Sequence, residues 1–247
     1  MSLFVSLEGG EGSGKSTQAK RLHERLIREG YATLLVREPG TTLLGSYLRD
    51  WLKRQVRQGD SVSPVAELFL FEAARAELVT KVIRPYLDAT PQGILITDRY
   101  MDSTTAYQAY GRRIDVKKVV EANAIATQGV FPDLTFLLDI TPEQGLNRVR
   151  AKIGLEEGVL SSKTRMDAEG TRRFEEESLA FHHRVRRGYL KLAGEASSRW
   201  RLVDATQSEN EVEEEIWVIM QETLAGLVSI NEPGQADLLT ANDYSEK

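Results

Sequence analysis

Residues 3–17 read LFVSLEGGEGSGKST, an apolar run followed by a glycine-rich turn. The turn fits G-x-x-x-x-G-K-[ST], the spacing of a phosphate-binding P-loop. Its glycines let backbone N–H groups surround phosphate oxygens, and the start of the next helix adds unpaired donors and a favourable dipole. This stretch therefore predicts a strand, a nucleotide-binding turn and a helix, in that order.

Individual residues of the turn have expected contacts with the nucleotide. Lys15 supplies a positive charge to the β- and γ-phosphates, and the Ser16 hydroxyl is placed to bind Mg²⁺. The residues expected to bind the nucleotide are Gly9, Gly10, Glu11, Gly12, Ser13, Gly14, Lys15, Ser16 and Thr17. A dinucleotide-binding fingerprint is excluded, because Lys15 occupies the position of its third glycine.

Four further apolar runs follow, at residues 33–36, 94–97, 134–138 and 200–203. Helical patterns separate the runs, and such alternation favours a parallel sheet covered by helices on both faces. The predicted fold class is α/β, a doubly wound parallel sheet of five strands with flanking helices, as in P-loop NTPases.

The expected boundaries follow from caps and prolines. We expect one helix over residues 14–29 and another over residues 64–85, with a third opened by Thr141 as its cap. A single domain is predicted at residues 1–228. The polar tail at residues 229–247 is expected to be disordered.

Composition narrows the function classes. The chain has 247 residues, 41% of them hydrophobic and 28% charged, which is ordinary for a globular protein. The absence of cysteine excludes disulfides, thiolate catalysis and Cys-ligated zinc, and three histidines argue against a His-based metal site. A net charge of −5 argues against a broad nucleic-acid-binding face. No apolar stretch is long enough to span a membrane and no secretion signal is evident, so we expect a cytoplasmic protein.

A second polar group follows the apolar run at residues 94–97. Asp98 and Arg99 come directly after it, and the carboxyl ends of strands face the ligand crevice in doubly wound sheets. Asp98 is therefore a candidate Mg²⁺ ligand, and the guanidinium fork of Arg99 suits a bridge between two phosphates. The guanine-reading N-K-x-D motif is absent from the sequence, which disfavours a GTP switch.

Several segments together resemble the thymidylate kinase (dTMP kinase) family, within the P-loop nucleoside monophosphate kinases. They are LEGGEGSGKSTQ at 7–18, REPG at 37–40, LFEAAR at 70–75, DRYMDSTTAYQ at 98–108, PDLTFLLDITPEQGLNR at 132–148 and DATQ at 204–207. The resemblance covers about residues 3–224. It implies a five-stranded sheet with a mobile lid, and the reaction ATP + dTMP → ADP + dTDP with Mg²⁺.

The resemblance also implies how the acceptor base is held. Phe71 is similar to the aromatic residue that stacks on thymine, and Arg75 to the residue that donates to a base carbonyl. They lie four positions apart on one predicted helix and so face the same cleft. Ser103 and Thr104 are expected at the base edge, with Gln108 beside the base.

The acceptor sugar and phosphate have their own implied partners. Tyr107 is similar to the tyrosine that packs on the sugar and disfavours a 2′-hydroxyl. Glu11 matches the acidic loop position near that sugar, and Arg49 matches the arginine that holds the dTMP phosphate. Glu38 and Pro39 are expected to line the acceptor site, with a cis peptide bond between them.

Because the loop interior carries no basic residue, the resemblance implies that the missing positive charge comes from a lid at about residues 150–173. Arg165, Arg172 and Arg173 are the candidates for closing over ATP. Arg148 and Thr206, the latter in the turn at 204–207, are expected near adenine.

The acceptor oxygen of a monophosphate is already anionic, so the predicted reaction needs no general base. Two other functions stay open: a P-loop kinase of a different nucleoside or monophosphate, and a non-catalytic nucleotide-binding regulator. The expected partners are small molecules, and the resemblance implies a homodimer with contacts around residues 122–126 and the helix that carries Phe71.

Overall fold

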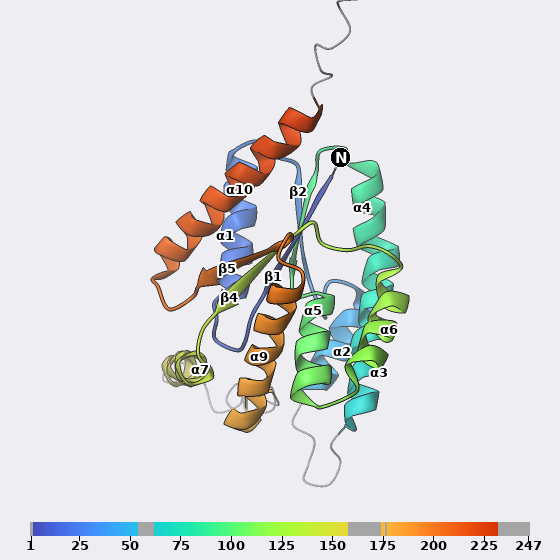
Figure 1. Ribbon diagram of the computed structural model, residues 1–247, viewed down its shortest axis with the longest axis vertical. Helices are drawn as coiled ribbons and strands as arrows, with labels where there is room; N and C mark the ends of the chain where they lie inside the picture. Colours follow the sequence, from blue (N-terminus) through green and yellow to red (C-terminus); the bar gives the residue numbers. More distant parts are fainter. Residues whose placement is uncertain (1, 54–61, 158–173, 176, 232–247) are drawn as a thin grey trace, which may run out of the picture.

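The computed structural model describes residues 2–53, 62–157, 174, 175 and 177–231. Its centre is a five-stranded sheet in which every pairing is parallel, with the order β2-β3-β1-β4-β5 (Figure 1). The strands are β1 (Leu3–Glu8), β2 (Thr33–Arg37), β3 (Ile94–Asp98), β4 (Leu134–Asp139) and β5 (Trp200–Asp204). The predicted fold class is confirmed.

Helices cover both faces of this sheet. On one face, α1 (Lys15–Arg28) and α10 (Glu209–Asn231) pack against alternate residues of β1, such as Val5 and Leu7. The other residues of β1, beginning with Phe4, face the opposite layer, because successive side chains of a strand point to opposite sides. Residues 6 and 8 share that second face.

The second layer contains the remaining helical segments described by the structure. Their bounds are α2 (Leu43–Lys53), α3 (Pro64–Leu78), η1 (Val79–Ile83), α4 (Arg84–Ala89), α5 (Met101–Thr104), η2 (Thr105–Gly111), α6 (Val116–Thr127) and α9 (Leu179–Glu195). Here η denotes π-helical backbone. Beyond the end of β4, α7 (Pro142–Glu157) packs against α9.

The helix expected over residues 64–85 does not end near Pro85; that prediction was wrong. Helical backbone continues through η1 and α4 to Ala89. Pro85 lies in the first turn of α4, directly after the π-helical segment, so the chain passes the proline at the point where its helical hydrogen-bond pattern changes. The proline therefore does not end the helical run.

Other predicted boundaries also shift. α7 stays helical through Glu157, so the lid expected at about residues 150–173 begins within a helix, and its residues 158–173 lie outside the described part. α10 extends to Asn231, so the boundary predicted after residue 228 falls inside it, and residues 232–247 are likewise outside. None of the described helices has the length and apolar character needed to cross a membrane.

The register of the sheet places the polar strand ends together. Asp98 is paired with Leu7 of β1 on one side and with Arg37 of β2 on the other. Because the strands are parallel, their carboxyl ends form one edge, and the P-loop leaves β1 at that edge.

Candidate active site

The P-loop is held by close backbone packing. Gly12 adopts φ 71°, and a Cβ atom there would lie 2.0 Å from the carbonyl oxygen of Gly145 in α7. Only glycine fits both the conformation and the space. Lys15, 7% exposed, donates to the Gly10 carbonyl at 3.1 Å, so its ammonium group lies against the loop that is expected to hold phosphate.

Asp98 and Ser16 meet where the sequence predicted a metal site. The Ser16 hydroxyl donates to Asp98 Oδ2 at 2.5 Å, and Oδ1 is buried without a hydrogen-bond partner among the described residues. Burial alone raises the pKa of Asp98, but Lys15, Ser16, Arg99 and Arg37 outweigh it and lower that pKa. An ionised carboxylate with a spare oxygen beside a hydroxyl suits Mg²⁺, which binds through one or two protein oxygens, water and phosphate.

Arg99 points at the P-loop. Its guanidinium donates to the Gly9 carbonyl at 3.2 Å, to Glu11 Oε1 at 2.9 Å and to the Tyr107 hydroxyl at 3.1 Å. Burial raises the pKa of the Glu11 carboxyl, but the charges of Arg99 and Lys15 and the Tyr107 hydrogen bond outweigh it, giving a pKa of about 2. The predicted meeting of strand-end arginine and P-loop is therefore present in the structure.

Arg49 brings another cation to the same edge. It donates to the carbonyl of Pro39 at 3.1 Å, and the Glu38–Pro39 peptide bond is cis, as expected. Burial, and then the nearby charge of Arg37, lower the pKa of Arg49. Cations placed this close favour an anion between them.

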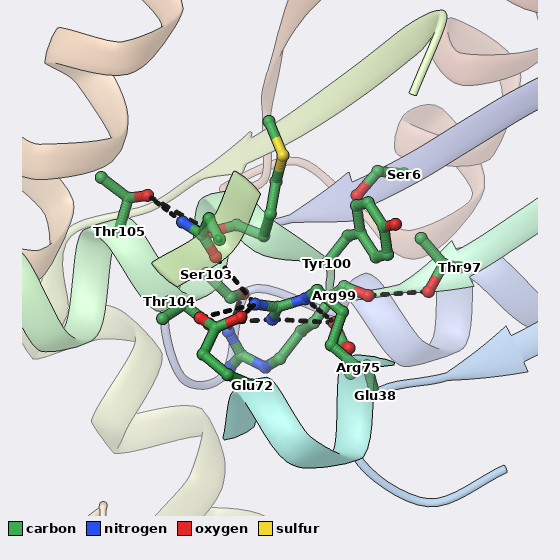
Figure 2. Close-up of polar contacts among 12 residues, drawn as sticks. Ser6, Glu38, Glu72, Arg75, Thr97, Arg99, Tyr100, Ser103, Thr104 and Thr105 are labelled. Atoms are coloured by element: carbon green, nitrogen blue, oxygen red, sulfur yellow. Dashed lines mark hydrogen bonds and ion pairs between the residues drawn. The ribbon is translucent and has the colours of Figure 1, made fainter. Parts of the chain in front are cut away.

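Arg75 is fully buried and saturated by hydrogen bonds (Figure 2). Its guanidinium donates to Glu38 at 2.9 and 3.0 Å, to Glu72 at 2.9 and 3.0 Å, and to Asn123 and Thr104 at 2.8 Å each. A guanidinium has five N–H groups, and all of them have an acceptor here. A contact between Arg75 and a base carbonyl therefore requires one acceptor to be exchanged.

Ser103, Tyr107 and Gln108 also have protein partners. Ser103 donates to Glu8 Oε2 at 2.6 Å, Tyr107 donates to Glu11 at 2.7 Å, and the amide of Gln108 donates to Glu67 at 2.8 Å. The predicted contact of Ser103 with the base edge stays a prediction. The single hydroxyl proton of Ser103 is donated to Glu8, so it is not available to the base in this arrangement.

These groups line one cleft of about 180 Å³, against about 20 Å³ for a second pocket beside His182, which has room for a single water molecule. The predicted residues that line the larger cleft are Glu11, Lys15, Ser16, Glu38, Pro39, Arg49, Phe71, Arg75, Asp98, Arg99, Ser103, Thr104, Tyr107 and Gln108. The sequence thus anticipated a set of side chains from five separate segments that the fold brings together.

The family model described as thymidylate kinase matches this chain over residues 7–216. The chain is 44% identical to thymidylate kinase of Roseiflexus castenholzii over 234 residues, covering 92% of this chain and 96% of that protein. It is 44% identical over 224 residues to thymidylate kinase of Nitratidesulfovibrio vulgaris, with coverage of 90% and 98%. A crystal structure of thymidylate kinase from Ehrlichia chaffeensis superposes with a TM-score of 0.65 at 29% identity, covering 89% of this chain and 98% of that one.

The chain belongs to the thymidylate kinase family. It is accordingly a phosphotransferase that acts on small molecules and takes its phosphoryl group from a nucleotide.

At the adenine end expected for a thymidylate kinase, Arg148 of α7 donates to the carbonyls of Ala205 at 2.7 Å and Thr206 at 3.2 Å. The helix after β4 and the turn after β5 are thereby joined, and their place beside adenine stays a prediction. The lid candidates Arg165, Arg172 and Arg173 lie outside the described residues.

Several residues that line or adjoin this cleft were not predicted from the sequence. Arg37 donates to Asp98 at 3.2 Å, and its place at the end of β2 would have revealed it, because that strand ends at the same edge. Phe174 lines the cleft and packs on Phe71 with ring centroids 6.1 Å apart. Tyr189 of α9 contacts Arg99 at 3.2 Å, and no local pattern distinguishes it from a core residue.

Proposed function

We propose that this protein phosphorylates dTMP to dTDP with ATP as donor and Mg²⁺ as the required ion, and so supplies dTTP. The observation that carries the proposal is one cleft whose lining includes Phe71 and Arg75 together with Lys15 of the P-loop and Arg99, which donates to the P-loop carbonyl of Gly9. Two nucleotides bound in that cleft have their phosphates end to end.

At the acceptor end, Phe71 stacks on thymine and Tyr107 packs on the sugar near Glu11. Arg75 reaches the base carbonyl by giving up its hydrogen bond to the Thr104 hydroxyl. That hydroxyl is uncharged, and the hydrogen bonds of Arg75 to the carboxylates of Glu38 and Glu72 are stronger. Glu38 and Pro39 form the wall beside them, with Gln108 close to the base.

No side chain has to abstract a proton, since the attacking phosphate oxygen is anionic. The residues instead align two anions and offset their charge. Arg49 holds the acceptor phosphate, Lys15 holds the donor phosphates, and Arg99 spans both. Ser16 and Asp98 would hold Mg²⁺, which supplies positive charge to the transferred group when bound. Arg37 helps to keep Asp98 ionised.

Four further assignments belong to this proposal. Arg165 and Arg173 stay predicted lid cations over ATP, and Arg148 and Thr206 stay predicted adenine neighbours. The protein is a homodimer through α3 and α6, which pack against each other and leave Phe69 and Ile125 62% and 80% exposed. A cytoplasmic location stays a prediction from the sequence.

The proposal is tested by release of ADP from ATP and Mg²⁺ with dTMP, dUMP, dCMP, dGMP or AMP as acceptor. We expect the highest kcat/KM with dTMP, and an appreciable rate with dUMP, because one methyl group contributes only about 1–3 kcal/mol of discrimination. Preference for another monophosphate would support the alternative kinase, and binding of ATP without turnover on any acceptor would support the non-catalytic regulator.

A further inference from the structure

Glu8, the last residue of β1, is a buried carboxylate to which the proposed reaction assigns no role. Its exposed fraction is 0%, and both oxygens are saturated. Oε1 accepts from the backbone N–H of Tyr100 at 2.8 Å and from the Ser6 hydroxyl at 3.0 Å. Oε2 accepts from the hydroxyls of Ser103 at 2.6 Å and Tyr189 at 3.2 Å. Glu8 thus joins β1, the turn after β3, α5 and α9.

The same two hydroxyls receive Arg99. One terminal nitrogen of its guanidinium donates to Ser103 Oγ at 3.0 Å and to the Tyr189 hydroxyl oxygen at 3.2 Å, and those hydroxyls lie 2.7 Å apart. Figure 2 shows Ser103 beside Arg99. A chain of hydrogen bonds therefore runs from Glu8 through Ser103 and Tyr189 to the guanidinium that faces the P-loop.

The proton count gives this chain a direction. A hydroxyl has one proton to donate and two lone pairs, and an ionised carboxylate only accepts. When Glu8 is ionised, Ser103 directs its proton to Oε2, and the single proton of Tyr189 is shared between Oε2 and Ser103 Oγ. Lone pairs of both hydroxyls therefore face Arg99. When Glu8 carries a proton on Oε2, that proton points at Ser103, the serine proton must turn away, and Arg99 competes for the remaining acceptors.

We propose that Glu8 is a positioning residue for Arg99: its carboxylate sets the direction of the Ser103 and Tyr189 hydroxyls, so that both accept from the guanidinium. It also anchors the backbone of Tyr100, next to the positive φ of 74° at Arg99. The inference rests on the proposed function, because it concerns the orientation of the arginine assigned to both phosphates.

Neighbouring groups shift the pKa of Glu8 in both directions. Burial raises the pKa of Glu8 to about 7, and the charge of Asp102 adds to this rise. Ser103, Arg99 and the Tyr100 amide act in the opposite direction. The contacts with Ser103, Arg99 and the Tyr100 amide therefore favour the ionised carboxylate, and their loss would raise the pKa of Glu8 further.

The test is the substitution Glu8→Gln in the full-length protein, which keeps the size of the side chain. An amide can accept on one side only, so it must present donors either to the Tyr100 N–H or to the two hydroxyls. We expect kcat to fall about 10- to 100-fold, with KM for both nucleotides changed less than about threefold. A crystal structure of the variant is expected to show the Arg99 guanidinium displaced from the Gly9 carbonyl.

A double-mutant cycle separates positioning from a general structural effect. Arg99→Lys removes the guanidinium fork, so Glu8→Gln should reduce kcat by less than about threefold in that background. The matched control is Asp133→Asn. Asp133 is also a carboxylate that accepts a backbone N–H, that of Phe4 in β1 at 2.8 Å, and its substitution should leave kcat within about twofold.

Should Glu8→Gln fail to fold, Ser103→Ala and Tyr189→Phe remove the same hydroxyls one at a time. We expect each to lower kcat about 3- to 10-fold in the wild-type background and to have little further effect on Arg99→Lys. An unchanged kcat in these variants, an equal loss in both backgrounds, or an unmoved Arg99 in the crystal would overturn the inference. The crystal outcome does not depend on the acceptor, so failure of the inference is distinguishable from failure of the proposed dTMP activity.

Discussion

Arg99 has a left-handed backbone, with φ 74°, at the end of the otherwise regular strand β3. Such a conformation costs a residue with a Cβ atom about 1–2 kcal/mol, so the surrounding contacts must maintain it. The backbone N–H of Arg99 donates to the Leu7 carbonyl at 3.1 Å, and the guanidinium has five hydrogen-bond partners across the P-loop and three helical segments. The contacts aim one side chain at the place where two phosphates are proposed to meet.

At this scale we predict that Arg99→Ala lowers kcat for phosphoryl transfer at least about 100-fold, because a charge that acts on the transferred group is lost. The matched control is Arg201→Ala, since Arg201 donates only to the nearby carbonyls of Ser198 and Trp200 among the contacts described. Steady-state kinetics of both purified variants makes the comparison. Full activity of Arg99→Ala would refute the charge-bridging role.

Local sequence predicted some residues of the site and could not predict others. Lys15, Ser16 and Asp98 follow from a motif and from the rule on strand ends. Glu8 and Tyr189 are 181 positions apart, and only the packing of α9 on the sheet brings them to 3.2 Å. Contacts of this kind depend on tertiary structure, so no pattern along the chain reports them.

Among the elements, each strand ends on a charged residue that follows its apolar run directly. These residues are Glu8, Arg37, Asp98, Asp139 and Asp204. An apolar pattern does not include them, although the backbone pairing continues. Their charge is itself informative, because the carboxyl ends of β1, β2 and β3 form the edge that carries the site.

The junction of the P-loop with α7 gives a prediction for an element. A Cβ atom at Gly145 would lie 2.2 Å from the Glu11 carbonyl, so Gly145→Ala must push the loop and the helix apart. We expect KM for ATP to rise at least about fivefold and the protein to lose about 1–3 kcal/mol of unfolding free energy.

Gly194→Ala serves as the control, because Gly194 lies within α9 with no atom within 4 Å of an added Cβ. There alanine should raise the unfolding free energy by about 0.5–1 kcal/mol and leave KM unchanged. Denaturant melts and ATP titrations of both variants decide the matter, and equal behaviour of the two would show that the loop–helix contact has no special role.

For the whole molecule, a buried carboxyl makes stability depend on pH. Burial raises the pKa of Glu38 from 4.5 to about 7, with Arg75 opposing the rise. The folded state then holds a proton that the unfolded state releases, so Glu38 makes stability fall as pH rises from 4.5 through 7 and has no further effect above that range.

Glu38→Gln should remove this slope, because glutamine does not titrate. We predict that, between about pH 5 and 8, the unfolding free energy of the wild type falls by about 2 kcal/mol more than that of the variant. Urea melts at several pH values measure it, and the slope is compared rather than the absolute stability, since the substitution also weakens the contact with Arg75. Parallel slopes would contradict the prediction.

Assembly also belongs to this scale. Light scattering should give the mass of two chains for the wild type and of one chain for Ile125→Asp, because a charge on the apolar face of α3 and α6 opposes its burial. Val218→Asp is the control, since Val218 is 51% exposed on α10 at the other face of the sheet. If the wild type is a monomer, or if both variants dissociate equally, the proposed interface is wrong.

The central claim is that two phosphate groups meet across the carboxyl edge of β1 and β3, under one arginine. A crystal structure with dTMP, Mg²⁺ and a non-hydrolysable ATP analogue measures this directly. The account predicts the dTMP phosphate beside Arg49, the donor phosphates beside Lys15, and Arg99 within hydrogen-bond distance of both. Both nucleotides bound in the cleft with Arg99 touching neither phosphate would contradict it.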